Sequence, residues 1–296
     1  MSYPLKKCAI LTIENLSDFE CYDEFLIEPM KELNWSLTFI PWDKDNINWD
    51  DYKIVIIRST WDYQKRLKDF LLVLRKIENS SAVLINPLNI VEWNIDKKYL
   101  YDLKRSGIEI VPSIFQEKFN PESIFDAFNQ FQCKQLIVKP TVGANADNIF
   151  LFNIETYYSH ERDLINTYSS RALIIQPFID SICSQGEYSL IYFGGIHSHT
   201  ILKKPKAGDF RSQEEHGGII SLVQDTPTDI KQAADKVINK IKKGFFYARI
   251  DLLYHKKIPV LIEIELIEPS LYFNLDPLSS KRFAIEFDKR FGENGK

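Results

Sequence analysis

The first ninety residues switch repeatedly between two patterns of apolar and polar positions. Apolar side chains recur at helical spacing over residues 20–33 and 67–77, which predicts two amphipathic helices. Short apolar runs typical of buried strands lie before, between and after them, at residues 9–13, 37–40, 53–57 and 82–85. Strands that alternate with helices indicate βαβ units and a mainly parallel sheet. We therefore predict an α/β fold that opens with a small Rossmann-like domain. Because the chain has no G-x-G-x-x-G motif, no dinucleotide site is expected.

Beyond residue 90 the pattern changes to longer helices and many short strands. Helical spacing predicts helices over residues 96–105, 121–132 and 225–243. Strands are predicted at residues 135–139, 148–152, 172–176, 187–193, 196–204, 246–253 and 259–267. The dipeptide Gly194-Gly195 is a hairpin signal between two of these strands. We expect three domains, over residues 1–92, 93–180 and 181–296.

The charge balance is slightly acidic, with 37 lysines and arginines against 41 aspartates and glutamates. A general nucleic-acid or anionic-membrane binder should show a basic excess, so we expect neither kind of partner. No apolar run approaches the ~18 residues that cross a bilayer, and the N-terminus lacks the cleavage site of a signal peptide. The four cysteines form no C-x-x-C pair, which is typical of plain thiols in a reducing compartment. We predict a cytoplasmic protein.

Three carboxylates and one arginine gather in the segments ARID and IEIEL near the C-terminus. Because side chains alternate along a strand, Arg249 and Asp251 share one face, and so do Glu263 and Glu265. An antiparallel register that matches the polar faces pairs Asp251 with Glu263 and Arg249 with Glu265. Oxygen ligands at this density suit Mg²⁺, with Mn²⁺ as a substitute, bound together with substrate phosphates. The alternative is a solvated outer face whose acids simply meet water.

Two lysines and a strand exit form a second group of candidates. Lys139 ends an apolar strand in QLIVKP, and Lys97 opens a predicted helix in WNIDKKYL. A phosphate site could use both, although a single lysine at the end of a strand is more often solvated. The strand LIIQP ends at Gln176 and could present backbone groups to an adenine edge. Asp180 or Glu187, further along, could reach a ribose or a metal.

The basic segment 203–218 adds candidate phosphate contacts. It carries Lys203 and Arg211, and Gly208 gives its backbone conformational freedom. A run of charges is usually a solvated face, but this one adjoins the end of a predicted strand. Arg211 is the strongest single candidate, because a guanidinium binds phosphate oxygens in a bidentate way.

The segment RSTWDY follows a predicted strand, and ligands bind at the carboxyl ends of parallel strands. We predict that Arg58 binds a substrate carboxylate and that Ser59 contacts the substrate. Trp61 would wall the pocket, and Asp62 would hold an amine. A purely structural loop is the alternative.

Two histidines, His197 and His199, share a face of a predicted hairpin strand. They could mimic a metal pair, but no third ligand lies nearby in the sequence. Exposed histidines are the better interpretation.

The order of these motifs resembles that of the ATP-grasp superfamily of carboxylate–amine ligases. The resemblance spans residues 55–272 and is nearest to the glutathione-synthetase-like branch that includes the O-ureido-serine cyclo-ligase of cycloserine biosynthesis. The segments that carry it are RSTWDY, WNIDKKYL, IVKP, QPFI, GEYSL, KKPKAGDFRSQEEHGG, RID and EIELIEPS. It implies a two-subdomain ATP-grasp fold after the Rossmann-like domain.

By this resemblance, Lys97 and Lys139 hold the α- and β-phosphates of ATP. Gln176 and Phe178 belong to the hinge whose backbone meets adenine. Asp180 or Glu187 would then contact the ribose.

The resemblance also assigns the metal and the catalytic positions. Asp251 and Glu263 correspond to metal ligands, and Glu265 stands where many relatives carry asparagine. The catalytic positions, which neutralise the γ-phosphate and the acyl phosphate, fall to Lys203, Arg211 and Arg249.

The implied activity is an ATP- and Mg²⁺-dependent ligation of a small, amino-acid-like substrate. The enzyme would activate a carboxylate as an acyl phosphate and couple it to an amine, giving an amide, ADP and phosphate. Two alternatives stay open: a ligase for a peptide or protein carboxylate, and a catalytically silent nucleotide-binding sensor with the same fold. Relatives of this type are often dimers or tetramers, so a homo-oligomer is left open too.

Overall fold

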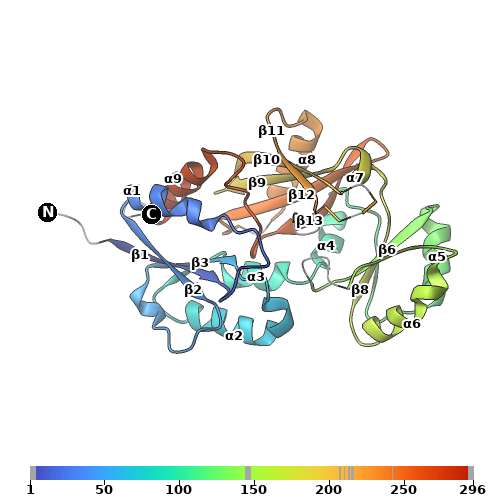
Figure 1. Cartoon of the computed structure of the whole chain (residues 1–296), viewed down its shortest axis with the longest axis horizontal. Helices are drawn as coiled ribbons and strands as arrows, with labels where there is room; N and C mark the ends of the chain where they lie inside the picture. Colours follow the sequence, from blue (N-terminus) through green and yellow to red (C-terminus); the bar gives the residue numbers. More distant parts are fainter. Residues whose placement is uncertain are drawn as a thin grey trace.

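Three β-sheets organise the chain, and the computed structural model describes residues 5–143, 148–206, 208–209, 211–212, 214, 217–241 and 243–292. Figure 1 shows the chain running from an N-terminal sheet, drawn in blue, to a sheet at the opposite end, drawn in green. It then returns to a third sheet between the two, drawn from yellow to orange.

The N-terminal sheet has the strand order β2-β1-β3-β4, and each neighbouring pair is parallel. Its strands are β1 (Lys6–Thr12), β2 (Trp35–Pro41), β3 (Ile54–Ser59) and β4 (Val83–Ile85). α1 (Ile27–Glu32) connects β1 to β2, and α2 (Leu67–Glu78) connects β3 to β4. α2 buries Phe70, Leu74 and Ile77, which recur at helical spacing. The predicted Rossmann-like domain is confirmed.

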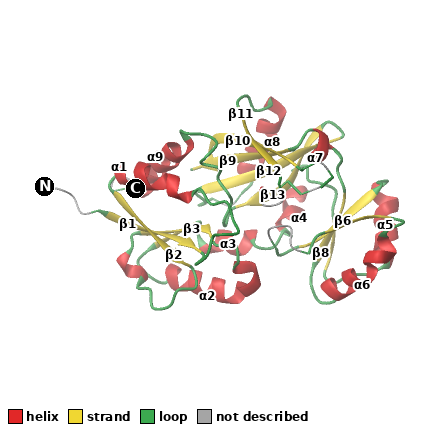
Figure 2. Cartoon of the chain, in the orientation of Figure 1, coloured by secondary structure: helices red, strands yellow, loops and turns green. Residues whose placement is uncertain are grey.

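The second sheet is antiparallel, with the order β5-β8-β6-β7. Its strands are β5 (Ile114–Gln116), β6 (Gln135–Pro140), β7 (Phe150–Asn153) and β8 (Leu173–Pro177). α5 (Glu122–Phe131) and α6 (Tyr157–Tyr168) pack on it and share an apolar core with its strands, as the right-hand side of Figure 2 shows.

The third sheet is also antiparallel, with the order β11-β10-β9-β12-β13. Its strands are β9 (Glu187–Phe193), β10 (Ile196–Lys204), β11 (Ile219–Val223), β12 (Tyr247–His255) and β13 (Ile258–Glu265). One face of this sheet packs on α3 (Leu88–Asn94), α4 (Tyr99–Arg105) and α8 (Thr228–Ile238). The other face packs partly on α9 (Ser279–Phe291), in an apolar core that continues into the N-terminal sheet. Short helices complete the fold: η1 (Asp23–Leu26), η2 (Trp49–Asp51), η3 (Tyr63–Arg66) and α7 (Ser181–Ser184).

The structure confirms the mixed α/β fold class and each predicted strand to within a few residues. Sequence patterns missed β5, β11, α3, α6 and α9. α6 shows why, since it is mostly polar and buries only Tyr157, Leu164 and Tyr168. The predicted helices over residues 20–33 and 225–243 are shorter in the structure. The three sheets fall in successive parts of the chain, and the domain boundaries stay a prediction.

Buried polar groups join the N-terminal sheet to the third sheet. Asn86 donates to the carbonyl oxygens of Tyr247 and Leu266 and accepts from the Phe246 N–H, over 2.6 to 2.9 Å. The Tyr247 hydroxyl donates to the carbonyl oxygens of Ile57 at 2.5 Å and Ile267 at 2.8 Å. This junction fixes the carboxyl end of β3 beside β12, and the candidate site lies there.

The interpretation of His197 and His199 as exposed hairpin histidines is wrong for His199. The pairing of β9 with β10 shifts register between these two residues, and His199 is buried, with Nε2 at 2.9 Å from the Leu271 carbonyl oxygen. Burial lowers the pKa of His199 to about 4, so the ring is neutral and Nε2 donates to that carbonyl. It is a structural histidine.

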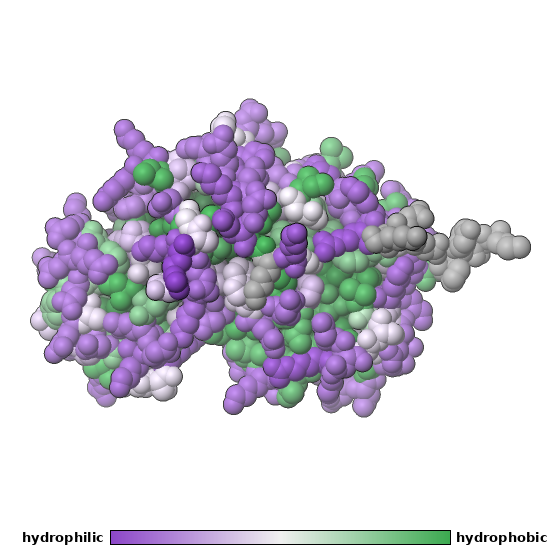
Figure 3. All heavy atoms as spheres, turned by 180° about the vertical axis from the view of Figure 1, so that it is seen from behind, coloured by the Kyte–Doolittle hydropathy of each residue, from purple (hydrophilic) through white to green (hydrophobic). Residues whose placement is uncertain are grey.

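Most of the face in Figure 3 is hydrophilic, with apolar side chains in scattered patches. Among the described residues, no helix is both long and apolar enough to cross a membrane.

Replacing Tyr247 by phenylalanine should lower the free energy of unfolding by about 1–3 kcal/mol, because buried carbonyl oxygens lose their donor. Denaturant unfolding measures this change. The matched control is Tyr101→Phe, since Tyr101 is exposed and surface substitutions usually change stability little. Equal effects of the two substitutions would contradict the role of the junction.

Candidate functional site

A cavity of ≈ 270 Å³ lies where the three sheets meet. Its walls include Trp61 after β3, Lys139 on β6 and Gln176 on β8. Asp251 on β12 and Glu263 on β13 line it as well. The volume is near the lower end of the range typical of small-molecule sites. Residues from all three predicted domains therefore meet around one space.

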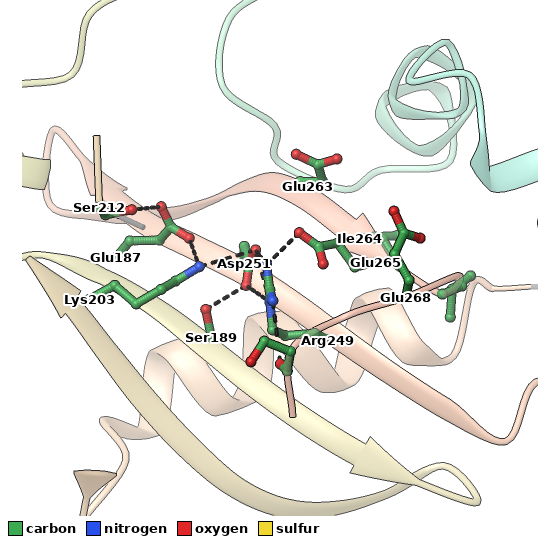
Figure 4. A network of polar contacts seen from close by, with 12 residues as sticks. Glu187, Ser189, Lys203, Ser212, Arg249, Asp251, Glu263, Ile264, Glu265 and Glu268 are labelled. Carbon is green, nitrogen blue, oxygen red and sulfur yellow. Dashed lines mark hydrogen bonds and ion pairs between the residues drawn. The ribbon is translucent and has the colours of Figure 1, made fainter. Parts of the chain in front are cut away.

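The predicted strand register is correct and creates an acidic wall. Asp251 lies opposite Glu263, and Arg249 lies opposite Glu265. Arg249 donates to Asp251 from Nε at 3.0 Å and from Nη2 at 2.9 Å, and it also pairs with Glu265. Ser189 donates to Asp251 at 2.6 Å. Figure 4 shows this network of polar contacts. Arg249 and Asp251 line the cavity and are buried, which excludes the solvated-face alternative for these two residues.

The acids of the wall titrate differently because their partners differ. Burial alone would raise the pKa of Asp251, but Arg249 and Lys203 lower it to about 2. For Glu265, burial outweighs Arg249 and raises the pKa to about 7, with Asp251 and Glu263 adding to the effect. Asp251 is therefore a permanent anion, whereas Glu265 changes charge near neutral pH.

The donor set fits a hard divalent cation in its chemistry. Asp251, Glu263 and Glu265 line the same cavity and offer only carboxylate oxygens, which Mg²⁺ accepts. In the part of the chain that the structure describes, no three His, Cys, Asp or Glu side chains converge as a metal site. Each acid instead faces a cation: Glu263 accepts from Lys97 at 2.8 Å, and the other two face Arg249. A metal ion would have to take over oxygens that these cations now hold.

Lys97 and Lys139, the two lysines predicted to bind the α- and β-phosphates, both line the cavity. Lys97 Nζ lies 2.7 Å from the Gly143 carbonyl oxygen, in addition to its pair with Glu263. Lys139 is buried and, within the described parts of the chain, forms no ion pair or side-chain hydrogen bond. Burial, followed by the nearby charge of Lys97, lowers its pKa, although Glu263 opposes the shift. Lys139 is thus a buried basic group whose charged form an anionic ligand would stabilise.

The basic segment contributes two cations of different character. Lys203 is buried and pairs with Glu187, and it lies 3.5 Å from Asp251. Arg211 lines the cavity, and Asp209 holds it through bonds from Nε at 3.1 Å and Nη2 at 2.8 Å.

The predicted hinge reaches the cavity through Gln176 and Phe178. The Gln176 side chain donates to Ser113 Oγ at 2.8 Å, and the Phe178 N–H donates to the Gln135 carbonyl oxygen at 2.9 Å. Since that N–H is in use, Phe178 would have to meet a base through its carbonyl group. Glu187 lines the cavity and accepts from Ser212 at 3.0 Å. Asp180 is the N-cap residue of α7 and is not part of the described cavity wall.

Most of the candidate substrate-binding residues of the RSTWDY segment lie outside the described cavity wall. Of its four candidates, Trp61 lines the cavity, and the other three are not among the described lining residues. Arg58 is buried in an ion pair with Asp23 at 2.8 Å. The remaining two bond within the N-terminal domain: Ser59 donates to Thr12 Oγ1 at 2.8 Å, and Asp62 accepts from the Trp42 indole at 2.7 Å.

Sequence reasoning missed Glu268, Tyr63 and Tyr272, which also line the cavity. Burial raises the pKa of Glu268 to about 8, with Glu265 adding to the shift. The signal for Glu268 was present, because EIELIEPS holds a third acid three residues after Glu265. The aromatic residues carry no such signal, since tyrosine is common in cores.

Comparison with family models covers most of the chain. Residues 119–278, more than half of the chain, match the model described as the ATP-grasp domain of prokaryotic glutathione synthetase. Residues 8–86 match the model of the N-terminal domain of the D-cycloserine synthetase DcsG.

Curated relatives point the same way. The chain is 24% identical over 292 residues to the cycloserine biosynthesis protein DcsG of Streptomyces lavendulae, covering 90% of this chain and 92% of that protein. It is 27% identical over 196 residues to a probable alpha-L-glutamate ligase of Coxiella burnetii, covering 65% of this chain and 62% of that protein.

Solved structures share the fold. The crystal structure of D-cycloserine synthetase DcsG superposes with a TM-score of 0.83 at 22% identity, covering 96% of this chain and 99% of that one. D-alanine–D-alanine ligase from Bacillus anthracis, complexed with ATP, gives 0.66 at 16% identity, covering 96% and 95%.

Replacing Arg249 by methionine should lower the free energy of unfolding by about 3–5 kcal/mol, because Asp251 and Glu265 lose a buried counter-charge. Chemical denaturation of the two proteins tests this. Arg75→Met is the matched control, since it removes an exposed pair with Glu92, and exposed pairs contribute little. Similar losses of unfolding free energy from both substitutions would show that Arg249 does not compensate the negative charge of the acidic wall.

Proposed function

Because the chain belongs to the family of the prokaryotic glutathione synthetase ATP-grasp domain, and is therefore an ATP-dependent ligase that forms C–N bonds, we propose that it activates a small carboxylate as an acyl phosphate. An amine then replaces the phosphate, giving an amide. Ligases of this family use ATP and a divalent metal ion, and we propose Mg²⁺ as the ion.

One observation carries the proposal: a single cavity holds both cations for phosphate and acids for a metal. Its basic side chains come from several parts of the chain, namely Lys97, Lys139, Lys203, Arg211 and Arg249. Its acidic wall is Asp251, Glu263 and Glu265. A site for a neutral ligand would not collect buried charges of both signs, because each costs desolvation free energy. A polyanion bound together with a metal ion satisfies both sets.

The chemistry needs positioned charge rather than an enzyme nucleophile. An oxygen of the substrate carboxylate attacks the γ-phosphorus of ATP. The bond between the γ-phosphorus and the oxygen that bridges it to the β-phosphorus breaks, and ADP leaves with that oxygen. The amine then attacks the acyl carbon, inorganic phosphate departs with one carboxylate oxygen, and the amine loses a proton. Bound at the acidic wall, Mg²⁺ would neutralise phosphate oxygens. Arg211 and Lys203, which line the same cavity, would stabilise the charge on the transferred phosphoryl group.

The substrate is proposed to be small and amino-acid-like. The cavity volume of ≈ 270 Å³ supports a small molecule over a protein surface. The names of two relatives agree, since one is a cycloserine biosynthesis protein and another is a D-alanine–D-alanine ligase. ADP release from Mg·ATP against pooled amino acids, small diacids and ureido or hydroxamate analogues tests the proposal. Binding of Mg·ATP without release stimulated by any pool would overturn it.

Replacing Arg211 by alanine should lower kcat about 10²- to 10³-fold while ATP binding largely survives, because its guanidinium acts on the transferred group. Steady-state ADP release and nucleotide titration separate the two effects. Arg162→Ala, at an exposed position on α6, is the control. Unchanged turnover in the Arg211 variant would contradict its role.

Replacing Lys139 by methionine should instead weaken ATP binding, by about tenfold or more, since a charge-assisted bond to phosphate contributes roughly 1.5–3 kcal/mol. Titration with a non-hydrolysable ATP analogue measures it. Lys134→Met, exposed just before the same strand, should bind normally. Equal affinities of the two variants would remove Lys139 from the phosphate site.

A further inference from the structure

The acidic side chains of the cavity differ in how their charge is balanced. Glu187 pairs with Lys203, Glu263 with Lys97, and both Asp251 and Glu265 with Arg249. Glu268 lines the same cavity, yet no lysine, arginine or histidine of the described residues forms an ion pair with it. Figure 4 shows it beside Glu265, on the side away from Lys203.

Neutral donors from the N-terminal domain hold Glu268 in place. Gln64 Nε2 donates to Glu268 Oε1 at 3.3 Å, and the Tyr63 hydroxyl hydrogen-bonds to the same carboxyl group. The Trp61 indole donates to the backbone oxygen of Glu268 at 2.9 Å. Hydrogen bonds therefore position both the side chain and the backbone of Glu268, and no ion pair with a described residue contributes. The RSTWDY segment thus lines the cavity with Trp61 and Tyr63, and it also holds Glu268 in place.

An uncompensated carboxylate in such a place is costly. Burial and the neighbouring Glu265 raise the pKa of Glu268 to about 8, although the hydrogen bond from Tyr63 and the more distant charge of Lys97 oppose the shift. Ionisation of Glu268 is therefore unfavourable near neutral pH unless a cation binds beside it. A ligand ammonium would supply the missing charge and would gain a charge-assisted hydrogen bond. A neutral ligand would not stabilise the ionised form of Glu268 in this way.

The cavity also contains a basic side chain that lacks an acidic partner among the described residues. Lys139, on β6, is a buried cation without a carboxylate partner among the described residues. Glu268 contacts Trp61 and Gln64 of the N-terminal domain, whereas Lys139 belongs to the second sheet. A set of ligands with phosphates toward Lys139 and an amine toward Glu268 would balance both groups.

We propose that Glu268 determines substrate specificity by binding the ammonium group of an α-amino acid whose own carboxylate is activated. This inference rests on the proposed function. Glu263 and Glu265 are close enough for their charges to act on Glu268, so an ammonium at Glu268 lies beside the wall where the phosphoryl group is transferred. In an α-amino acid one carbon separates the amine from the carboxylate, which places the carboxylate at that wall.

The test compares amino acids with the same acids lacking the amine. ADP release from Mg·ATP is measured with both enantiomers of alanine and serine, and with propionate and 3-hydroxypropionate, in the presence of hydroxylamine as the nucleophile. We expect kcat/KM for the better amino acid to exceed that for its desamino partner by about ten- to a hundredfold, the scale of a bond to a charged group. Equal values in the wild-type protein would overturn the inference.

The variant Glu268→Gln sharpens the test, because its amide oxygen can still accept from Gln64. It should lose about ten- to a hundredfold in kcat/KM for the amino acid, mainly through KM, and should lose nothing for the desamino acid. Glu268→Asp, which keeps the charge, should retain the preference for the amine. Glu24→Gln, exposed on η1, is the control. Equal losses of Glu268→Gln on both kinds of acid would assign Glu268 a structural role and overturn the inference.

The two proposals fail in different ways. If the acids stimulate ADP release but the amine makes no difference, the ligase function stands and the role of Glu268 falls. If neither kind of acid stimulates release, although Mg·ATP binds, the proposed function falls and the inference falls with it.

Discussion

Compensation of buried charge is the constraint on which the rest of the structure depends. Arg249 on β12 lies between Asp251 on its own strand and Glu265 on β13. An isolated carboxylate in this place would cost several kcal/mol, so the strand register, the position of Arg249 and the ionisation of Asp251 are linked. A shift of the register by one residue would turn these side chains toward the apolar core beneath α3 and α4.

The same balance prepares the cavity for phosphate chemistry. Charges that are already fixed need little reorganisation when a transition state forms, which is how electrostatic catalysis works. Lys97 and Arg249 keep Glu263 and Glu265 in position. Lys139 and Glu268 have no ion-pair partner among the described residues, although Gln64 and Tyr63 hydrogen-bond to Glu268.

Local patterns predicted the parts of the fold and the site that depend on strand alternation. Asp251 facing Glu263 follows from the period of two along each strand. The four strands of the N-terminal sheet were predicted from their short apolar runs. The position of Arg58 could not be predicted this way, because its partner Asp23 lies 35 residues earlier in the chain. Glu268 is visible in the sequence as the third acid of EIELIEPS, but its contacts with Gln64 and Trp61, which lie 204 and 207 residues earlier in the chain, could not be predicted from local patterns. His199 was misread because a shift in register, invisible in the sequence, buries it.

The central claim is that a substrate carboxylate becomes an acyl phosphate, and oxygen labelling tests it most directly. A pool of amino acids with ¹⁸O in the carboxylate is turned over with unlabelled Mg·ATP, and the inorganic phosphate is analysed by mass spectrometry. The account predicts one ¹⁸O in each phosphate released, because the carboxylate oxygen leaves with the phosphoryl group. Phosphate without label, or label in AMP, would contradict it.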